Sequence, residues 1–145
     1  MELIIKKFDE LTNKELYEII RARVDVFVVE QNCPYKELDG IDYRAVHLFY
    51  EDEEGKILAY IRVFEKDRTT AQIGRVITAV RGKGYGLMII NAGINYLKAL
   101  PQYKKIYLEA QCYAIGFYEK AGFKVVSEPF LEDGIRHVKM EKELK

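Results

Sequence analysis

Three alternating glycines separate a segment typical of a β-strand from a segment typical of an α-helix. The strand-like segment runs from Ile73 to Thr78, and the loop at 81–86 reads RGKGYG before the helical segment from Leu87. Glycines at a helix entrance leave backbone N–H groups uncovered at the positive end of the helix dipole. Phosphate groups bind well at such a place. The loop therefore predicts a ligand that carries phosphate.

The composition is that of a globular chain. Of 145 residues, 49% are hydrophobic and 32% are charged, which favours one folded domain spanning 1–145. The 23 acidic and 23 basic residues cancel, so no net field attracts nucleic acid or a membrane surface.

The N-terminal segment and the cysteines indicate an intracellular protein. Charged residues in the first 11 positions exclude a secretory signal, and no apolar run approaches the ~20 residues of a membrane span. Cys33 and Cys112 form neither a CxxC pair nor a metal-spaced cluster, so we expect packing roles, no metal and no disulfide framework. The expected location is the cytoplasm.

Hydrophobic periodicity and turn residues predict the secondary structure. Thr12 to Glu15 has the form of a capping box at the start of a helix from Asn13 toward Val28. Asp52 to Gly55 is a hairpin signal, and Gly122 suits the left-handed end of a helix. The expected strands are 2–8, 45–51, 57–65, 71–78, 105–111, 124–128 and 137–143, with further helices at 87–100 and 114–121 and loops at 31–43 and 129–136. This order predicts an α+β fold of three layers, in which helices cover both faces of a mixed, mostly antiparallel sheet.

The glycine loop lacks the spacing of a dinucleotide fingerprint and the lysine of a Walker A loop. Its pattern, Arg-x-x-Gly-x-Gly, is short enough to occur by chance as a flexible turn. Its position between a strand and a helix favours the phosphate-binding interpretation.

The loop resembles the pyrophosphate loop of the GNAT superfamily, the Gcn5-related N-acetyltransferases. Further blocks resemble the ElaA-like branch and extend the resemblance over nearly the whole chain: Phe27–Tyr35, Asp39-Gly40, Ile73–Val76, Ala110-Gln111, Phe117 to Phe123 and Glu132 to His137. The resemblance implies a sheet splayed between its fourth and fifth strands, with acetyl-CoA inserted in the opening. The residues implied to bind this cofactor are Val76, Ile77, Thr78, Arg81, Gly82, Lys83, Gly84, Tyr85, Gly86, Leu87 and Tyr118. The Ile77 N–H is the expected donor to the thioester carbonyl.

The resemblance also implies that Tyr118 is a general acid. Phenol and thiol have pKa values of about 10 and 8.5, so a phenol beside a departing thiolate can protonate it. From its spacing alone, packing against Phe123 at a helix end is the favoured interpretation of Tyr118.

A base must remove a proton from an ammonium before it attacks. Glu109 is the first candidate, on one strand face with Tyr107 and Gln111. Glu30, His47 and His137 are the other candidates for this base and are also candidate substrate contacts, although each also suits a structural role. The acids near the 31–43 loop, including Glu37, Asp39 and Asp42, suit either a cationic substrate or an ordinary solvated loop.

These features predict an N-acetyltransferase in which the amine attacks acetyl-CoA directly in a ternary complex. The acceptor is a small-molecule amine or a peptide N-terminus, and the protein is a monomer or a homodimer. The alternative is an acyl-CoA-binding sensor or interaction module without activity.

Overall fold

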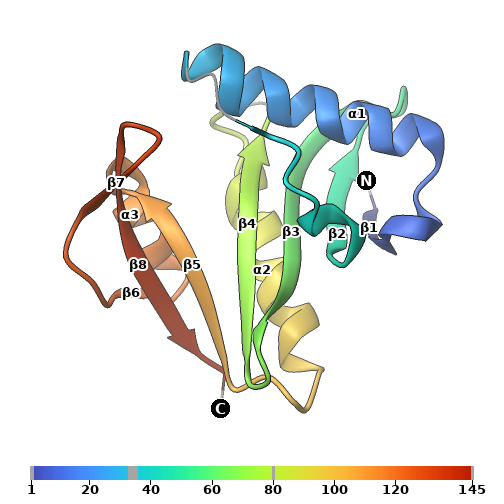
Figure 1. The fold of residues 1–145 in the computed structure, drawn as a ribbon. Coiled ribbons are helices and arrows are strands. Elements are labelled where there is room, and N and C mark those ends of the chain that lie inside the picture. The colour runs from blue at the N-terminus through green and yellow to red at the C-terminus, as the bar shows by residue number, and fades with distance from the viewer. Residues whose placement is uncertain (1, 33–35, 80, 145) are drawn as a thin grey trace.

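The computed structural model describes residues 2–32, 36–79 and 81–144, so Cys33 and Val80 lie outside the described residues. Within these ranges, eight strands form one sheet in the order β1-β2-β3-β4-β5-β8-β6, with β7 paired to β8 (Figure 1). The strands are β1 (Leu3–Lys7), β2 (Val46–Glu51), β3 (Ile57–Asp67), β4 (Thr70–Thr78), β5 (Lys105–Gln111), β6 (Lys124–Val125), β7 (Phe130–Glu132) and β8 (Ile135–Glu143). The helices are α1 (Asn13–Arg23), α2 (Tyr85–Lys98) and α3 (Ile115–Lys120), with short 3-10 turns η1 (Phe8–Glu10), η3 (Ile41–Tyr43) and η4 (Cys112–Ala114) and the π-helical η2 (Val24–Glu30).

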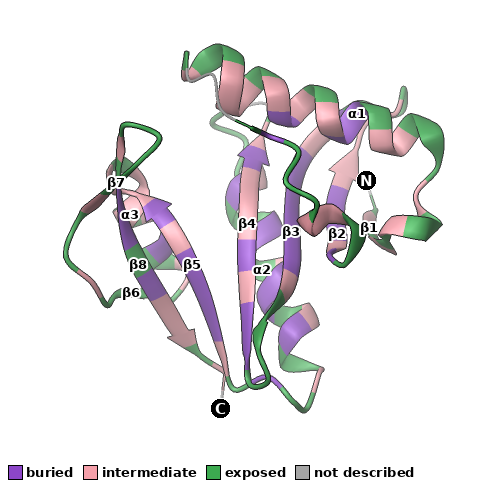
Figure 2. Ribbon diagram, viewed as in Figure 1, coloured by how far each residue is buried: buried purple, intermediate pink, exposed green. Residues whose placement is uncertain are grey.

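Helices cover both faces of the sheet, as predicted. Alternate residues of the strands point to opposite faces, so Leu48 and Ile61 join the core under α2, while Phe49 and Tyr60 pack with Ile19 of α1. The buried positions therefore follow both faces of the central strands (Figure 2). The β5–β8 half is different, because its buried residues other than Tyr107 and His137 belong to the cluster on the α2 side.

The sheet is splayed between β4 and β5. These two strands are parallel and pair only from Thr70 opposite Lys105 to Gln72 opposite Tyr107. Beyond that point β4 continues to Thr78 and β5 to Gln111 without pairing to each other, and the two ribbons diverge (Figure 1). The predicted splay between the fourth and fifth strands is therefore confirmed.

Several local predictions are also confirmed. The Glu15 N–H donates to Thr12 Oγ1 at 3.0 Å and the Thr12 N–H donates to Glu15 Oε1 at 2.8 Å, which completes the capping box. The predicted hairpin joins β2 to β3. Gly122 is left-handed with φ +97°, and the Phe123 N–H donates to the Tyr118 carbonyl at 3.1 Å.

Two regions differ from the prediction. The first helix changes to π-helical geometry at Val24, where the β-branched run Val24 to Val29 has low α-helical propensity. The expected strand at 124–128 is only two residues long. The expected loop at 129–136 contains β7 and a tight Asp133-Gly134 turn, and both turn residues have positive φ.

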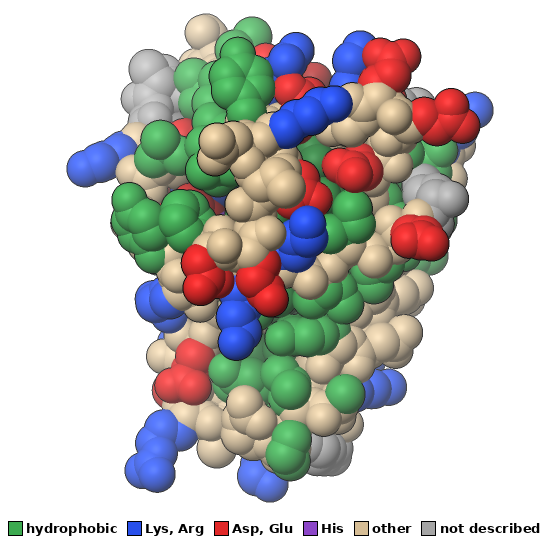
Figure 3. All heavy atoms as spheres, turned by 90° about the vertical axis from the view of Figure 1, so that its right-hand side faces the viewer, with side chains coloured by type: hydrophobic (Ala, Val, Ile, Leu, Met, Phe, Trp, Pro, Cys, Tyr) green, Lys and Arg blue, Asp and Glu red, His purple; other side chains and the backbone are tan. Residues whose placement is uncertain are grey.

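The surface carries charges of both signs. Acidic and basic side chains are interspersed on the face shown in Figure 3. Among the described residues, no helix is long and apolar enough to cross a membrane.

Candidate functional site

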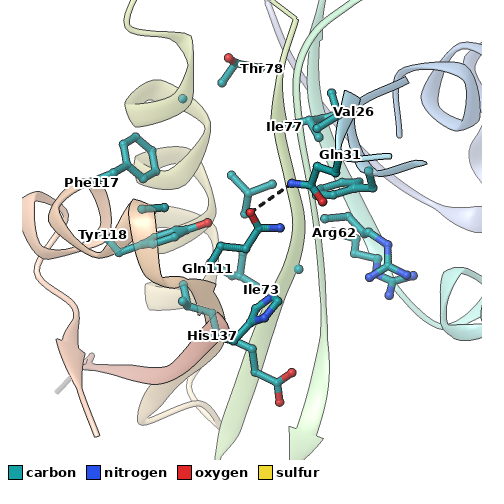
Figure 4. Close-up of a pocket in the computed structure, with 18 of the residues that line it drawn as sticks. Val26, Gln31, Arg62, Ile73, Ile77, Thr78, Gln111, Phe117, Tyr118 and His137 are labelled. Atoms are coloured by element: carbon teal, nitrogen blue, oxygen red, sulfur yellow. Dashed lines mark hydrogen bonds between the residues drawn. The ribbon is translucent and has the colours of Figure 1, made fainter. Parts of the chain in front are cut away.

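A cleft of about 850 Å³ occupies the opening between β4 and β5 (Figure 4). Its walls come from the C-terminal half of β4, the glycine loop, the start of α2, the end of β5, α3 and the β7–β8 hairpin. Val26 and Gln31, at the end of the first helical segment, close it from the other side of β4. Segments far apart in the chain therefore meet at the opening between β4 and β5.

The glycine loop leads directly into α2. Gly84 is the N-cap residue, with φ +77°, and no side chain caps the helix. A Cβ on Gly82 or Gly84 would meet nothing within 4 Å, so the backbone there is open to a ligand. A Cβ on Gly86 would lie 3.0 Å from Thr78 Cγ2 and 3.2 Å from the Phe117 ring, so a larger residue would push into the cleft wall. An open backbone at the N-terminus of a 14-residue helix suits a pyrophosphate group.

The free edge of β4 exposes backbone groups to the cleft. The Ala79 N–H donates to the Leu58 carbonyl of β3 at 2.9 Å. N–H groups alternate in direction along a strand, so the N–H of Ile77 also faces β3 and that of Thr78 faces the opening. The register therefore directs the Thr78 N–H, and not the Ile77 N–H, toward the cleft. A bulge at Arg75 (φ +53°) precedes this stretch.

Tyr118 packs at the helix end and also lines the cleft. Its ring packs edge-on against Phe117 and Phe123, with centroids 5.1 and 6.1 Å apart. Its hydroxyl points into the cleft toward Gln111 (Figure 4) and has no hydrogen-bond partner in the described part of the chain. Burial raises the pKa of the Tyr118 phenol, so the hydroxyl keeps its proton at neutral pH.

Glu109 and His137 also line the cleft. The Tyr107 hydroxyl donates to Glu109 Oε2 at 2.8 Å. His137 Nδ1 lies 2.8 Å from the Ile135 carbonyl, and its Nε2 lies 3.7 Å from Glu132 Oε2. Glu132 of β7 lines the same cleft.

Three expected site residues lie elsewhere. His47 is fully buried, with Nδ1 2.7 Å from the Tyr60 hydroxyl and Nε2 3.1 Å from the Asp42 carbonyl, and it does not line the cleft. Burial lowers the pKa of His47, which favours a neutral structural histidine. Glu30 forms an ion pair with Arg81 at 3.4 Å and does not line the cleft. Lys83 is exposed in the glycine loop and does not line the cleft either.

The acids after the first helix pair with arginines: Glu37 is buried, Asp42 is half-buried, and Asp39 is exposed and lines the cleft. We call Glu37, Asp39 and Asp42, with Arg23, Arg62 and Arg75, the loop cluster. Arg23 donates to Glu37 at 2.6 Å and to Asp42 at 2.7 Å, and it is almost fully buried. Arg62 donates to Asp39 at 2.6 Å. Burial opposes the ionised form of Asp39, but the hydrogen bond and charge of Arg62 outweigh it and lower the pKa of Asp39 to about 2.

One hydrogen bond crosses the cleft. Gln31 Nε2 donates to Gln111 Oε1 at 3.1 Å and joins the end of the first helical segment to the end of β5 (Figure 4). Thr78 and Phe117 lie on one side of this bridge, and Ile73 and His137 lie on the other. The bridge therefore divides the glycine-loop end of the cleft from the β7–β8 end.

Glu132 and Gln31 were missed as site residues. The Asp133-Gly134 pair is a strong signal for a two-residue hairpin and could have placed Glu132 beside Ile135 at the cleft. Gln31 had no comparable signal, because its position depends on the π-helical turn before it.

Comparisons with known proteins agree with this geometry. Residues 11–144 match the sequence model of the family described as "Acetyltransferase (GNAT) domain". The chain is 40% identical to a UPF0039 protein of Schizosaccharomyces pombe over 99% of this chain and 98% of the relative, and 36% identical to protein ElaA of Escherichia coli over 93% and 92%. An acyl-CoA N-acyltransferase structure from Pseudomonas aeruginosa superposes with a TM-score of 0.90 at 34% identity, covering 98% of this chain and 99% of that one.

Proposed function

The chain belongs to the ElaA-like branch of the GNAT acetyltransferase family, and we propose that it transfers an acetyl group from acetyl-CoA to a primary amine. The amine attacks directly in a ternary complex, and the reaction takes place in the cytoplasm. The observation that carries this proposal is the opening between β4 and β5, which has the glycine loop and Tyr118 on its walls.

Each group that lines the cleft has a separate role in the proposed reaction. The N–H groups of 84–87 bind the pyrophosphate, and the β4 edge aligns the pantetheine arm. Bound acetyl-CoA supplies the thioester, whose C–S bond breaks as the new C–N bond forms. The Thr78 N–H polarises the carbonyl, Glu109 accepts a proton from the amine, and Tyr118 donates its proton to the departing sulfur. Holding both reactants in one cleft removes much of the entropic barrier.

The test measures acetyl-CoA binding by calorimetry and thiol release with a panel of amines. Gly84→Asp/Gly86→Asp places two carboxylates at the phosphate position, and we expect it to abolish both binding and turnover. Gly55→Asp is the matched control, because Gly55 is also left-handed (φ +86°) but lies in the β2–β3 turn outside the cleft. Tyr118→Phe should lower turnover by about 100-fold without weakening acetyl-CoA binding.

Three outcomes would contradict the proposal. Equal binding of ATP and acetyl-CoA would remove the cofactor assignment. Full turnover by the double aspartate variant would remove the loop from the site. Tight acetyl-CoA binding without turnover of any amine would instead indicate a sensor or interaction module.

A further inference from the structure

The hydrogen bond between Gln31 and Gln111 joins the two walls of the cleft, and neither side chain has a role in the proposed reaction. Gln31 Nε2 donates to Gln111 Oε1 at 3.1 Å, although the two residues are 80 positions apart in the chain. Both residues are half-buried and line the cleft. Because each amide offers a donor and an acceptor, the bond also forms when both amides are turned over. We call this pair the glutamine bridge.

Two unusual backbone conformations flank Gln31. The π-helical η2 ends directly before it at Glu30, and Asn32 directly after it has a left-handed φ of +48°. π-helical winding sends the next side chain to a different side of the helix from the one that α-helical winding would give it. A left-handed conformation is unfavourable at a residue other than glycine. The chain thus keeps two locally unfavourable conformations around the residue that reaches Gln111.

The glutamine bridge lies between the positions of the two reactants in the proposed reaction. Thr78, whose N–H faces the opening, lies on the glycine-loop side of the bridge, and His137 lies on the other side (Figure 4). The Tyr118 hydroxyl points toward Gln111 (Figure 4). The pantetheine arm comes from the glycine loop, so it brings the thioester to the bridge from the Thr78 side. Bound acetyl-CoA then fills that end of the cleft, and the amine must enter from the β7–β8 end.

The closed bridge therefore separates the amine from the thioester. The C–N bond can form only after the two amides move apart. Opening leaves a donor of Gln31 and an acceptor of Gln111 without their partners in a half-buried site, which is unfavourable. An amine N–H can replace the Gln31 amide as the donor to Gln111 Oε1. The bridge thus opens at low cost only when an amine takes the place of Gln31.

We propose that Gln31 and Gln111 select an amine over water as the acceptor of the acetyl group. This inference rests on the proposed acetyl transfer. The amine belongs to a larger substrate, whose other contacts with the cleft supply the free energy that opens the bridge. A water molecule has no such contacts, so without substrate the bridge stays closed and shields the thioester. In the open state Gln111 Oε1 accepts an N–H of the attacking nitrogen and positions it near the Tyr118 hydroxyl.

The two competing reactions differ in the nucleophile. With an amine, the C–N bond forms as the C–S bond breaks, and one proton moves from the nitrogen to the sulfur through Glu109 and Tyr118. With water, a C–O bond forms instead, and the products are acetate, CoA and a proton. Each reaction releases one thiol per thioester consumed. Thiol release without an amine therefore measures hydrolysis directly.

The first experiment measures thiol release from acetyl-CoA with and without n-butylamine. Gln31→Met and Gln111→Met keep the side-chain length but remove the hydrogen bond, and we expect each to raise hydrolysis by about tenfold. Gln111→Met should also lower kcat/KM for n-butylamine by about tenfold, because the nitrogen loses its acceptor, whereas Gln31→Met should not lower it. The affinity for acetyl-CoA, measured by calorimetry, should stay unchanged in both variants.

The variant Gln31→Met/Gln111→Met tests whether the two side chains act as one unit. Removing either partner already breaks the bridge, so the double variant should hydrolyse acetyl-CoA no faster than the single variants. Gln102→Met is the matched control, because Gln102 is exposed in the turn before β5 and does not line the cleft. Unchanged hydrolysis in both single variants, or effects that multiply in the double variant, would overturn the proposal.

The second experiment follows the bridge itself and needs no turnover. Acetonyl-CoA, in which a CH₂ group separates the sulfur from the carbonyl, is bound to the protein, and n-butylamine is then titrated. NMR records the side-chain NH₂ signals, and we expect those of Gln31 and Gln111 to shift while that of Gln102 does not. Unchanged signals of Gln31 and Gln111, up to the amine concentrations that support turnover, would overturn the selection by the bridge even if acetyl transfer is observed. Absence of acetyl-CoA binding would instead overturn the proposed function, and with it the thioester that the bridge shields.

Discussion

The loop cluster and the two glutamates Glu109 and Glu132, which line the cleft, both present carboxylates, yet their surroundings differ. In the loop cluster each acid receives hydrogen bonds from arginines, and Arg23 and Arg62 are nearly inaccessible. Glu109 and Glu132 line the cleft and have no arginine partner among the described residues; the Tyr107 hydroxyl donates to Glu109, and His137 Nε2 lies 3.7 Å from Glu132. The arginines hold the acids of the loop cluster in place, whereas Glu109 and Glu132 lack such partners in the described part of the chain. Acidic composition alone does not separate these roles.

The largest effect we expect follows from removing a cation of the loop cluster. Arg23→Met leaves Glu37 and Asp42 without their closest partner in a buried setting, and we expect a loss of about 3–5 kcal/mol of unfolding free energy in urea. Arg21→Met is the matched control, since its side chain is 55% exposed and its pair with Glu18 contributes less than about 1 kcal/mol. If the two variants were equally stable, the loop cluster would not have a structural role.

A smaller effect is expected in acid. The pKa of Asp39 is lowered to about 2, so its contribution is present above the unfolded value of about 3.9 and is lost as the pH falls toward 2. Asp39→Asn should therefore cost about 1 kcal/mol at pH 7 after solvent screening, and this cost should vanish near pH 2. Unfolding curves across this range measure the difference, and a cost independent of pH would show that the charge is not responsible.

The smallest effect has the opposite sign. The pKa of Glu132 is raised, so its favourable contribution exists below the unfolded value of about 4.3 and is lost as the pH rises through the folded value. Glu132→Gln should thus be slightly more stable than the natural chain at pH 7, by less than about 1 kcal/mol, and the gain should disappear near pH 4. If Glu132→Gln were less stable than the natural chain at pH 7, the Glu132 carboxylate would stabilise the fold, as we expect for that of Asp39.

Local signals predicted most of the fold. The capping box at Thr12, the hairpin at Gly55 and the helix end at Gly122 depend on residues close in the chain, and all three are present. The π-helical turn and the short β6 were not predicted, because hydrophobic periodicity does not distinguish α-helical from π-helical geometry and gives the ends of strands poorly. Backbone register has a long-range origin, and it directs the Thr78 N–H rather than the Ile77 N–H toward the cleft.

The site was predicted unevenly for the same reason. The glycine loop and Tyr118 are recognisable from sequence and line the cleft. His47, in contrast, is a partner of Tyr60 and of the Asp42 carbonyl, which no spacing indicates. The ion pairs of the loop cluster join residues 14 to 38 positions apart, so the acids there could not be distinguished from solvated ones.

The three-residue contact between β4 and β5 also bears on self-association. An unpaired strand edge normally invites a strand from another molecule and thus aggregation. Here the unpaired stretch of β4 lies inside the sheet, because β5 rejoins β4 at Thr70 and β8 extends the sheet beyond β5. A neighbouring chain could reach that edge only through the cleft itself. The protein can therefore keep a row of backbone donors available to a ligand without exposing an unpaired strand edge that promotes aggregation.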